Sequence, residues 1–250
     1  MTDTAAALER LIRHGGLVDD ETDGDDLPDD GDDGFGEAMA VVDALVASGD
    51  RGLVPRARAA LLTFLDDRNF YGRDLMAQLL AGLLGPEALP ILLDAAARDL
   101  GDDQDSLAAE IVDLLQGHRA VARSVVLRYA TDPDPTRRRE GLWALGFVVD
   151  VADLDLLASA AVDPDPEIRS VALGSLGGLS TEDRAFAVLV AGLNDVAASV
   201  RSSAVSALGY SGRRDAVAPL LTRATDPDGQ VRRLLAHALG SLGEPAATPA

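Results

Sequence analysis

The chain of 250 residues contains no cysteine and no lysine. The absence of cysteine excludes disulfides, thiolate metal sites and cysteine nucleophiles. The absence of lysine excludes Schiff-base chemistry and phosphate-binding loops that depend on lysine. Aromatic residues make up 4% of the sequence and hydrophobic residues 47%, so the core must consist mainly of leucine, valine and alanine. Closely stacked helices require small and aliphatic side chains of this kind.

The sequence also has no run of consecutive apolar residues long enough to span a bilayer, and its N-terminal segment, from Met1 to Gly16, carries acids and arginines. A membrane span or an apolar signal core is therefore not expected, and we predict a cytoplasmic protein. The formal net charge is −20. This charge repels the phosphate backbone, so nucleic acid is disfavoured as a partner.

One pattern recurs three times in the second half of the chain. Arg169, Arg201 and Arg232 each begin a nine-residue segment that ends in Leu-Gly, and their sequence numbers differ by 32 and then by 31. A fixed period of this length is typical of a solenoid of stacked repeats.

The same register extends toward the N-terminus. The position that the glycine holds in each segment is occupied by Gly82, Leu114, Gly146, Gly177, Gly209 and Gly240 in successive units. Their sequence numbers differ by 32, 32, 31, 32 and 31. One further step back reaches a turn at Asp50, between expected helices at 38–48 and 53–65. We therefore predict about seven helical pairs, of which the last has only its first helix.

Within each unit, local signals define two helices. Asp165 precedes Pro166 as an N-cap followed by proline at the first helical position. The first helix of that unit is expected to bury one stripe, formed by Ile168, Ala172, Leu176 and Leu179. For the second helix of the next unit, the expected buried set is Ala216, Val217, Leu220, Leu221 and Ala224.

Composition divides the chain into three parts. Residues 1–18 are expected to form an N-terminal helix, and residues 37–250 the solenoid. Residues 19–36 contain nine aspartates and one glutamate, which predicts a solvated acidic linker. A calcium-loop frame runs from Asp19 to Asp30, but Asp26 occupies the position that needs an apolar residue, so the linker is favoured.

On these residues the chain resembles the HEAT-repeat family, and most of all the short bacterial type found in phycobiliprotein lyases. The matching motif is Asp-Pro-Asp-x-x-(Val/Ile)-Arg followed by Leu-Gly, at residues 163–169 and 226–232. The resemblance implies an all-α, right-handed α-α superhelix, with first helices on the convex side and second helices along a concave groove. It also implies that the repeated arginines pair with the aspartates between repeats.

The resemblance places the candidate partner-binding residues on that groove. They are charged and polar residues of second helices: Asp94, Arg98, Arg128, Asp155, Ser159, Thr222 and Arg223. Trp143, Phe147 and Tyr210 fall on first helices. For Trp143, a place in the core is favoured over a role as a semi-exposed interface anchor.

Catalytic chemistry has little support in the sequence. The histidines at 14, 118 and 237 are isolated, and the repeated His-Glu pairs of HEAT-type di-iron hydroxylases are missing. We predict no metal, no cofactor and no enzyme activity. The leading hypothesis is a scaffold or adaptor that holds a partner protein or peptide, for which a basic surface is favoured. The alternative is a HEAT-like enzyme that acts on a chromophore or nucleic acid, of the lyase or DNA glycosylase type. The oligomeric state is left open.

Overall fold

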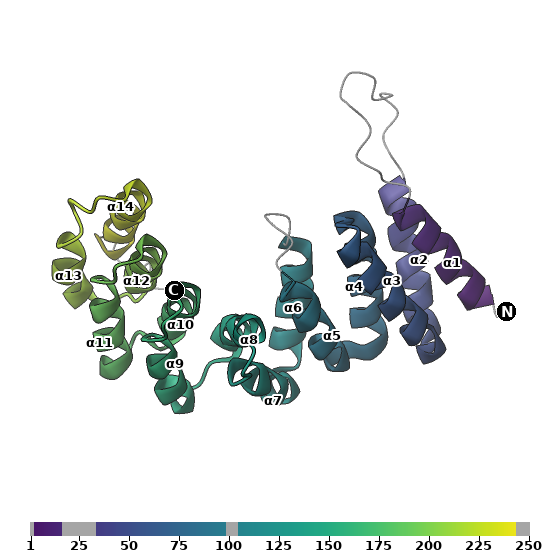
Figure 1. Cartoon of the computed structure of the whole chain (residues 1–250), viewed down its shortest axis with the longest axis horizontal. Coiled ribbons are helices and arrows are strands. Elements are labelled where there is room, and N and C mark those ends of the chain that lie inside the picture. Colours follow the sequence, from purple (N-terminus) through teal and green to yellow (C-terminus); the bar gives the residue numbers. More distant parts are fainter. Residues whose placement is uncertain (1–2, 17–33, 99–104, 244–250) are drawn as a thin grey trace, which may run out of the picture. The chain divides into compact units, whose positions relative to one another are not determined.

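The computed structural model describes residues 3–16, 34–98 and 105–243, and within these ranges the secondary structure is helical, without a strand. The contacts divide the chain into two compact units, Met1–Val125 and Val126–Ala250. Each unit is described by itself. The all-α fold of successive helical pairs is as predicted (Figure 1).

The first unit begins with a docked N-terminal helix. Its helices are α1 (Asp3–Gly15), α2 (Gly34–Ser48), α3 (Val54–Asp66), α4 (Phe70–Leu84), α5 (Leu89–Ala96) and α6 (Asp105–Gly117). Leu8 and Leu11 of α1 are 1% and 2% exposed, and α1 packs against α2 and α4. The amide of Asn69 donates to the carbonyl of Gly15 at 2.7 Å. The expected acidic linker, with its calcium-like frame, lies mostly outside the described residues, but α2 already begins at Gly34.

One stretch of the first unit, Phe70–Ala96, is apolar and long enough to cross a membrane by composition, with a mean hydropathy of 1.5. In the structure it is not one continuous helix, because α4 ends at Leu84 and Gly85 takes a φ of 58°. Over half of its most apolar window is buried within the protein. Its hydropathy is therefore accounted for by core packing.

The second unit continues the helical pairs. α7 (Arg119–Ala130) spans the division, and α8 (Pro135–Val148), α9 (Leu154–Ala160), α10 (Pro166–Leu176), α11 (Asp183–Gly192), α12 (Ala198–Gly209), α13 (Val217–Leu221) and α14 (Gly229–Gly243) follow. The α-helices from α2 to α13 form six pairs, and α14 is the single first helix of the seventh. The predicted number of units is confirmed.

The helix caps follow the signals in the sequence. The carboxylate of Asp134 accepts hydrogen bonds from the backbone N–H groups of Thr136 and Arg137 at the start of α8. At the start of α10, Asp165 accepts from Glu167 in the same way, with Pro166 at the first position. Each cap satisfies N–H groups that the helix leaves without a partner.

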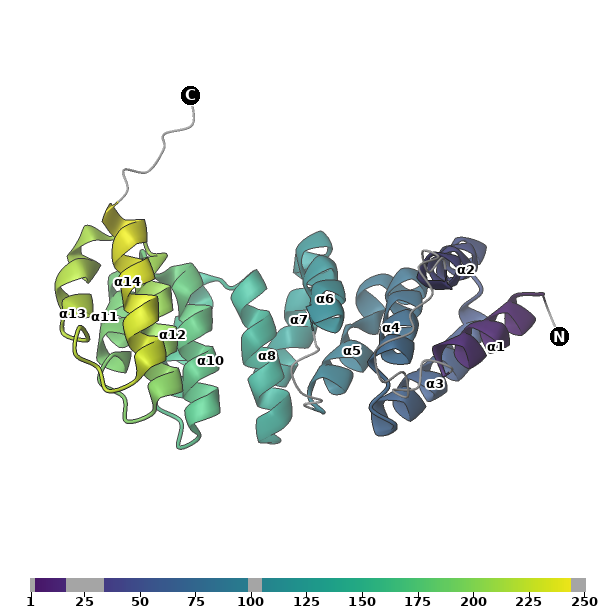
Figure 2. The same cartoon turned by 90° about the horizontal axis from the view of Figure 1, so that it is seen from above.

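In the second unit the first helices form the inner layer of the stack. We call α8, α10, α12 and α14 the inner layer and α9, α11 and α13 the outer layer. The inner helices pack on one another in succession, whereas the outer helices have little contact with each other. In Figure 1 the inner layer follows the inside of the curve of this unit, and in Figure 2 it forms one row in front.

Small residues explain why successive helices of the inner layer pack more closely than those of the outer layer. A Cβ added to Gly146 would meet Ser175 of the next inner helix at 3.0 Å. The corresponding contacts are Gly177 with Ala207 at 3.4 Å and Gly209 with Ala238 at 2.5 Å. At these seams, a side chain at Gly209 would force α12 and α14 apart, and one at Gly146 would displace Ser175, whereas Gly177 only just contacts Ala207. The expectation that second helices line the concave side is therefore wrong for this unit.

The predicted core is largely confirmed. Ile168, Ala172 and Leu176 are at most 1% exposed, and Leu179 is 6% exposed. In the outer layer Ala216 and Leu220 are fully buried, as expected. Leu221, however, is 52% exposed, because α13 is too short and too far from its outer neighbours for a second buried row.

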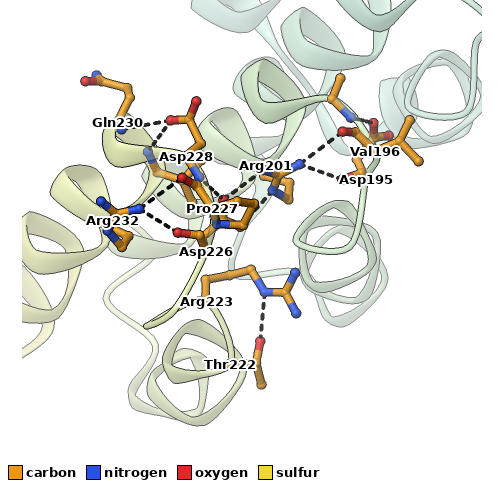
Figure 3. A network of polar contacts seen from close by, with 12 residues as sticks. Asp195, Val196, Arg201, Thr222, Arg223, Asp226, Pro227, Asp228, Gln230 and Arg232 are labelled. Carbon is orange, nitrogen blue, oxygen red and sulfur yellow. Dashed lines mark hydrogen bonds and ion pairs between the residues drawn. The ribbon is translucent and has the colours of Figure 1, made fainter.

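Arginine–aspartate pairs connect successive units along the stack. Arg201 donates from Nε and Nη2 to both carboxylate oxygens of Asp226 at 2.8 Å, as Figure 3 shows beside the neighbouring contacts. Its Nη1 donates to the backbone carbonyls of Asp195 and Val196. Arg169 makes the same contacts with Asp195 and its own loop, and Arg138 contacts Asp163 at 3.3 Å. The predicted structural role of these arginines is confirmed.

Each shared aspartate also shapes its own loop. The carboxylate of Asp195 accepts from the backbone N–H of Ala197, and that of Asp226 from Asp228. The hydrogen bonds from Arg169 and Arg201 lower the pKa of Asp195 and Asp226, respectively, below the ordinary value. The acids therefore stay ionised, and charge-assisted bidentate bonds hold the repeats in register.

We predict opposite effects for two Gly→Ala substitutions in the inner layer. In Gly141→Ala, the new methyl would overlap the backbone of Tyr129 and Ala130, so we expect a loss of about 2–3 kcal/mol in the free energy of unfolding. In Gly174→Ala nothing lies within 4 Å of the methyl, so we expect a gain of about 0.5–1 kcal/mol. Urea unfolding followed by circular dichroism measures both. Equal effects would contradict the described packing.

Arg201→Gln should destabilise the fold far more than Arg138→Gln. The side chains of Arg201 and Asp226 are 9% and 1% exposed, against 27% and 20% for Arg138 and Asp163. Removing Arg201 leaves a buried carboxylate without its cation, for a cost of about 3 kcal/mol. Removing Arg138 from the more exposed pair should lower the free energy of unfolding by about 1 kcal/mol or less. Denaturant unfolding of the two variants at pH 7 tests this order.

The effect of Arg201→Gln should depend on pH in one direction. Because Arg201 lowers the pKa of Asp226 in the folded state, the stabilisation is present above the unfolded pKa of aspartate, about 4. It is lost as the pH falls through the lower, folded-state pKa. The difference in unfolding free energy between wild type and variant should therefore shrink in acid, and a difference that grew in acid would refute the assignment.

Candidate partner-binding face

The predicted partner-binding residues are divided between the two units. Asp94 and Arg98 belong to the first unit, where Arg98 pairs with Asp66 at 2.6 Å. The other five belong to the second unit: Arg128 of α7, Asp155 and Ser159 of α9, and Thr222 and Arg223 directly after α13. Asp155 pairs with Arg184, and Nε of Arg223 donates to the hydroxyl of Thr222 at 3.3 Å. A binding role for these residues remains a prediction.

The inner layer instead exposes aromatic side chains. Phe147 of α8 is 37% exposed and Tyr210, directly after α12, is 76% exposed, while Trp143 is half-buried. The rings of Trp143 and Phe147 meet edge to face, with centroids 5.1 Å apart. Trp143, for which a place in the core was predicted, is thus only partly buried. Phe147 and Tyr210 lie on the exposed side of helices whose opposite side is buried.

Trp143 and Phe147 line a shallow groove of about 350 Å³, which we call the aromatic groove. Its other lining residues are small: Gly146, Ser170, Val171, Gly174, Ser175 and Ser203. The hydroxyls of Ser170 and Ser203 lie 2.9 Å apart, and Ser175 donates to the carbonyl of Leu142 at 2.7 Å. The groove therefore combines two rings with short polar groups of neighbouring inner helices.

A second, smaller hollow lies further along the same layer. It has a volume of about 30 Å³ and is lined by Ser206, Gly209, Tyr210, Leu234, His237, Ala238 and Ser241. The rings of Tyr210 and His237 lie edge to face with centroids 6.0 Å apart. Together with the aromatic groove, this hollow defines what we call the inner face.

The residues that line the aromatic groove carry no formal charge. Four residues before Trp143 in the sequence, Arg139 of α8 bonds Glu140 at 3.0 Å and Glu167 of α10 at 2.8 Å. These charges are thus paired with each other. An apolar or aromatic side chain can enter the groove without placing a charge in an apolar environment.

A signal in the repeats could have found the exposed aromatics. Five positions after each repeated arginine stand Trp143, Gly174, Ser206 and His237 in successive units. Nine positions after it stand Phe147, Gly178, Tyr210 and Ser241. Core positions keep an aliphatic or small apolar residue from unit to unit, whereas these two positions change between aromatic, polar and glycine. Such variation indicates a face that does not pack against the repeats.

Among the described residues there is no group of three or more histidine, aspartate or glutamate side chains that is placed to hold a metal ion. His14 contacts the hydroxyl of Tyr71 at 3.0 Å, and His237 lies beside Tyr210. These two histidines therefore have aromatic neighbours, and no candidate metal centre emerges from the part of the chain that is described.

Comparison with known sequences gives a family match for the C-terminal part of the chain. Residues 186–250 match the HEAT-repeat family, which covers 65 of the 250 residues. A comparison with curated proteins gives no match. HEAT repeats are thus supported for this part of the chain, and the closer resemblance to the phycobiliprotein-lyase type is not confirmed.

Solved structures similar to this chain are helical repeat proteins and related folds. A designed armadillo repeat protein in complex with the peptide (KR)4 is 14% identical, with 94% of this chain and 99% of that chain covered and a TM-score of 0.42. Human deoxyhypusine hydroxylase is 20% identical, with 95% and 90% covered and a TM-score of 0.41. An engineered protein is 18% identical, with 95% and 68% covered and a TM-score of 0.46.

Trp143 is the only tryptophan of the chain, so its fluorescence reports on the aromatic groove alone. Phe147→Ala removes the ring that covers one edge of Trp143. We expect a red-shifted emission and stronger quenching by acrylamide, with a loss of unfolding free energy of at most about 1.5 kcal/mol. Tyr210 lies in the other hollow, so Tyr210→Ala is the control and should leave the Trp143 emission unchanged. An unchanged Phe147→Ala spectrum would contradict the described groove.

Proposed function

We propose that this protein is a non-enzymatic scaffold or adaptor that holds a partner protein or peptide against the inner face of its second unit. The observation that carries the proposal is the exposure of Trp143, Phe147 and Tyr210 on a layer of tightly stacked helices. Aromatic side chains at partly exposed positions are enriched at the centres of protein interfaces.

Rigidity of the layer supports the same function. The seam glycines and the arginine–aspartate pairs fix the inner helices before any partner arrives. A preformed surface loses little conformational entropy on binding, so more of the contact energy remains as affinity. The aromatic groove of about 350 Å³ is large enough for one or two side chains of a partner.

The charge of the protein favours a basic partner. The net charge is −20, while the lining of the aromatic groove is uncharged and its neighbouring charges are paired. Long-range attraction would therefore accelerate the encounter, and aromatic contacts would hold the complex. The proposed ligand is a segment with one apolar anchor flanked by basic residues.

A designed peptide experiment tests this function. Random peptides displayed on phage are selected on the full chain, and the recovered peptides are titrated against it with Trp143 emission as the readout. We expect an apolar anchor with basic flanks, and a loss of affinity of about tenfold or more in Phe147→Ala. Added salt should slow association more than it speeds dissociation.

Leu221→Ala provides the matched control, since Leu221 is an exposed apolar residue of the outer layer. It should leave the affinity unchanged. Peptides whose binding survives Phe147→Ala and Tyr210→Ala but is lost in Leu221→Ala, or in substitutions of Asp155 and Ser159, would move the binding surface to the outer layer. That result would overturn the proposal.

A further inference from the structure

The last helix of the stack, α14, carries an arginine that lacks the partner its equivalents have. Arg232 donates from Nη1 to the backbone carbonyls of Asp226 and Pro227 at 2.7 and 3.1 Å, as Arg201 does to its own loop (Figure 3). Arg138, Arg169 and Arg201 in addition bond the aspartate of the following unit. Within residues 106–243, no carboxylate forms an ion pair with Arg232. The side chain of Arg232 is exposed.

The glycine seam is open at the same end. Gly146, Gly177 and Gly209 each receive a small residue of the next inner helix. Gly240 stands at the same position of α14, and nothing lies within 4 Å of the place where its Cβ would be. At the earlier junctions the next inner helix packs on this position. On α14, none of the described residues occupies it.

The exposed residues on this side of α14 stand at the same repeat positions as the residues of α12 that pack against the next inner helix. On α12, Arg201, Val205, Leu208 and Gly209 are buried in a helix against which α14 packs. The equivalent residues of α14 are Arg232, Ala236, Leu239 and Gly240, and all are exposed except the half-buried Leu239. We call these four residues the end face. Apart from the arginine, the end face presents no polar side chain.

The three filled junctions specify what fits on such a surface. In each, an aspartate of the incoming loop binds the arginine, and a small residue of the incoming helix packs on the glycine. The small residue stands twelve positions after the aspartate every time: Asp163 and Ser175, Asp195 and Ala207, Asp226 and Ala238.

We propose that the end face binds an α-helix of a partner protein in which an aspartate of the preceding loop stands twelve positions before an alanine or serine. The partner would extend the stack by one helix and supply the carboxylate that Arg232 lacks. Bidentate pairing with a carboxylate suits the planar guanidinium, and the glycine admits the close approach. The inference is independent of the function proposed for the inner face.

A second copy of the chain fits this surface less well. Each copy has a net charge of −20, so two copies repel each other. The loop aspartates Asp163, Asp195 and Asp226 already bond arginines of their own chain. The remaining one of the series, Asp132, lies in the loop before α8, where its carboxylate is 3.9 Å from the guanidinium of Arg137.

The chain itself provides the probe for this proposal. A synthetic peptide of residues 226–243 contains the loop and helix that dock on α12, so it should dock on the equivalent end face of the full chain. Fluorescence anisotropy of the labelled peptide measures binding. We expect Arg232→Gln to weaken it about tenfold, and the Asp226→Asn peptide to weaken it by a similar factor. Combined, the two changes should weaken binding little more than either alone, because they remove one contact.

Two further variants separate binding from folding. Gly240→Leu fills the open seam and should abolish peptide binding, while its melting temperature stays at or above that of the wild type. Arg233→Gln removes the same charge next to the end face and should change the affinity by less than about twofold.

Four outcomes would overturn the proposal. Peptide binding that survives both Arg232→Gln and Gly240→Leu, or an absence of binding at millimolar peptide, excludes the end face as a helix-docking site. Self-association of the full chain in sedimentation that Gly240→Leu abolishes would assign the surface to a second copy. Binding that arises only after removal of residues 244–250 would assign it to the chain's own terminus.

Discussion

The bond between an arginine of one repeat and an aspartate of the next is the interaction on which the second unit depends. It joins three elements at once: the inner helix that carries the arginine, the loop carbonyls before that helix, and the loop of the following unit. Because the aspartate also caps its own loop, a single carboxylate fixes both the shape of the loop and its distance from the previous repeat. The stacking of hydrophobic faces alone would permit helices to slide.

The glycine seams act together with this bond. They bring the inner helices close, which narrows that layer and leaves the outer helices spread. The curvature of the unit therefore has its origin in side-chain volume on one layer. The same close packing turns the remaining side of each inner helix outward, and this is where the aromatic residues lie.

The regular spacing of the repeats was sufficient to predict the helical pairs and their number, and the Asp-Pro signals were sufficient to predict the caps, because these residues recur in register. The arginine–aspartate pairs were implied by the resemblance to HEAT repeats. The inner and outer layers could not be assigned from that spacing. Which helix of a pair lies on the inside follows from the approach distances at Gly146, Gly177 and Gly209, and these depend on the residues opposite. The predicted partner-binding residues therefore belong to second helices, whereas the exposed aromatics lie on first helices. The sequence also favoured a core position for the half-buried Trp143, since aromatic type alone does not distinguish the two sides of a helix.

The arginine–aspartate bond has a consequence for how such a protein changes in length. Every junction from α8 to α14 uses the same pair of residues at nearly the same offset, so each unit fits before or after any other. Duplication or deletion of a complete unit in the gene would keep every junction intact. A gain or loss of a few residues inside a helix would instead break the two junctions on either side of it. The architecture thus permits growth by whole modules, and natural variation in such a chain should come in steps of one repeat.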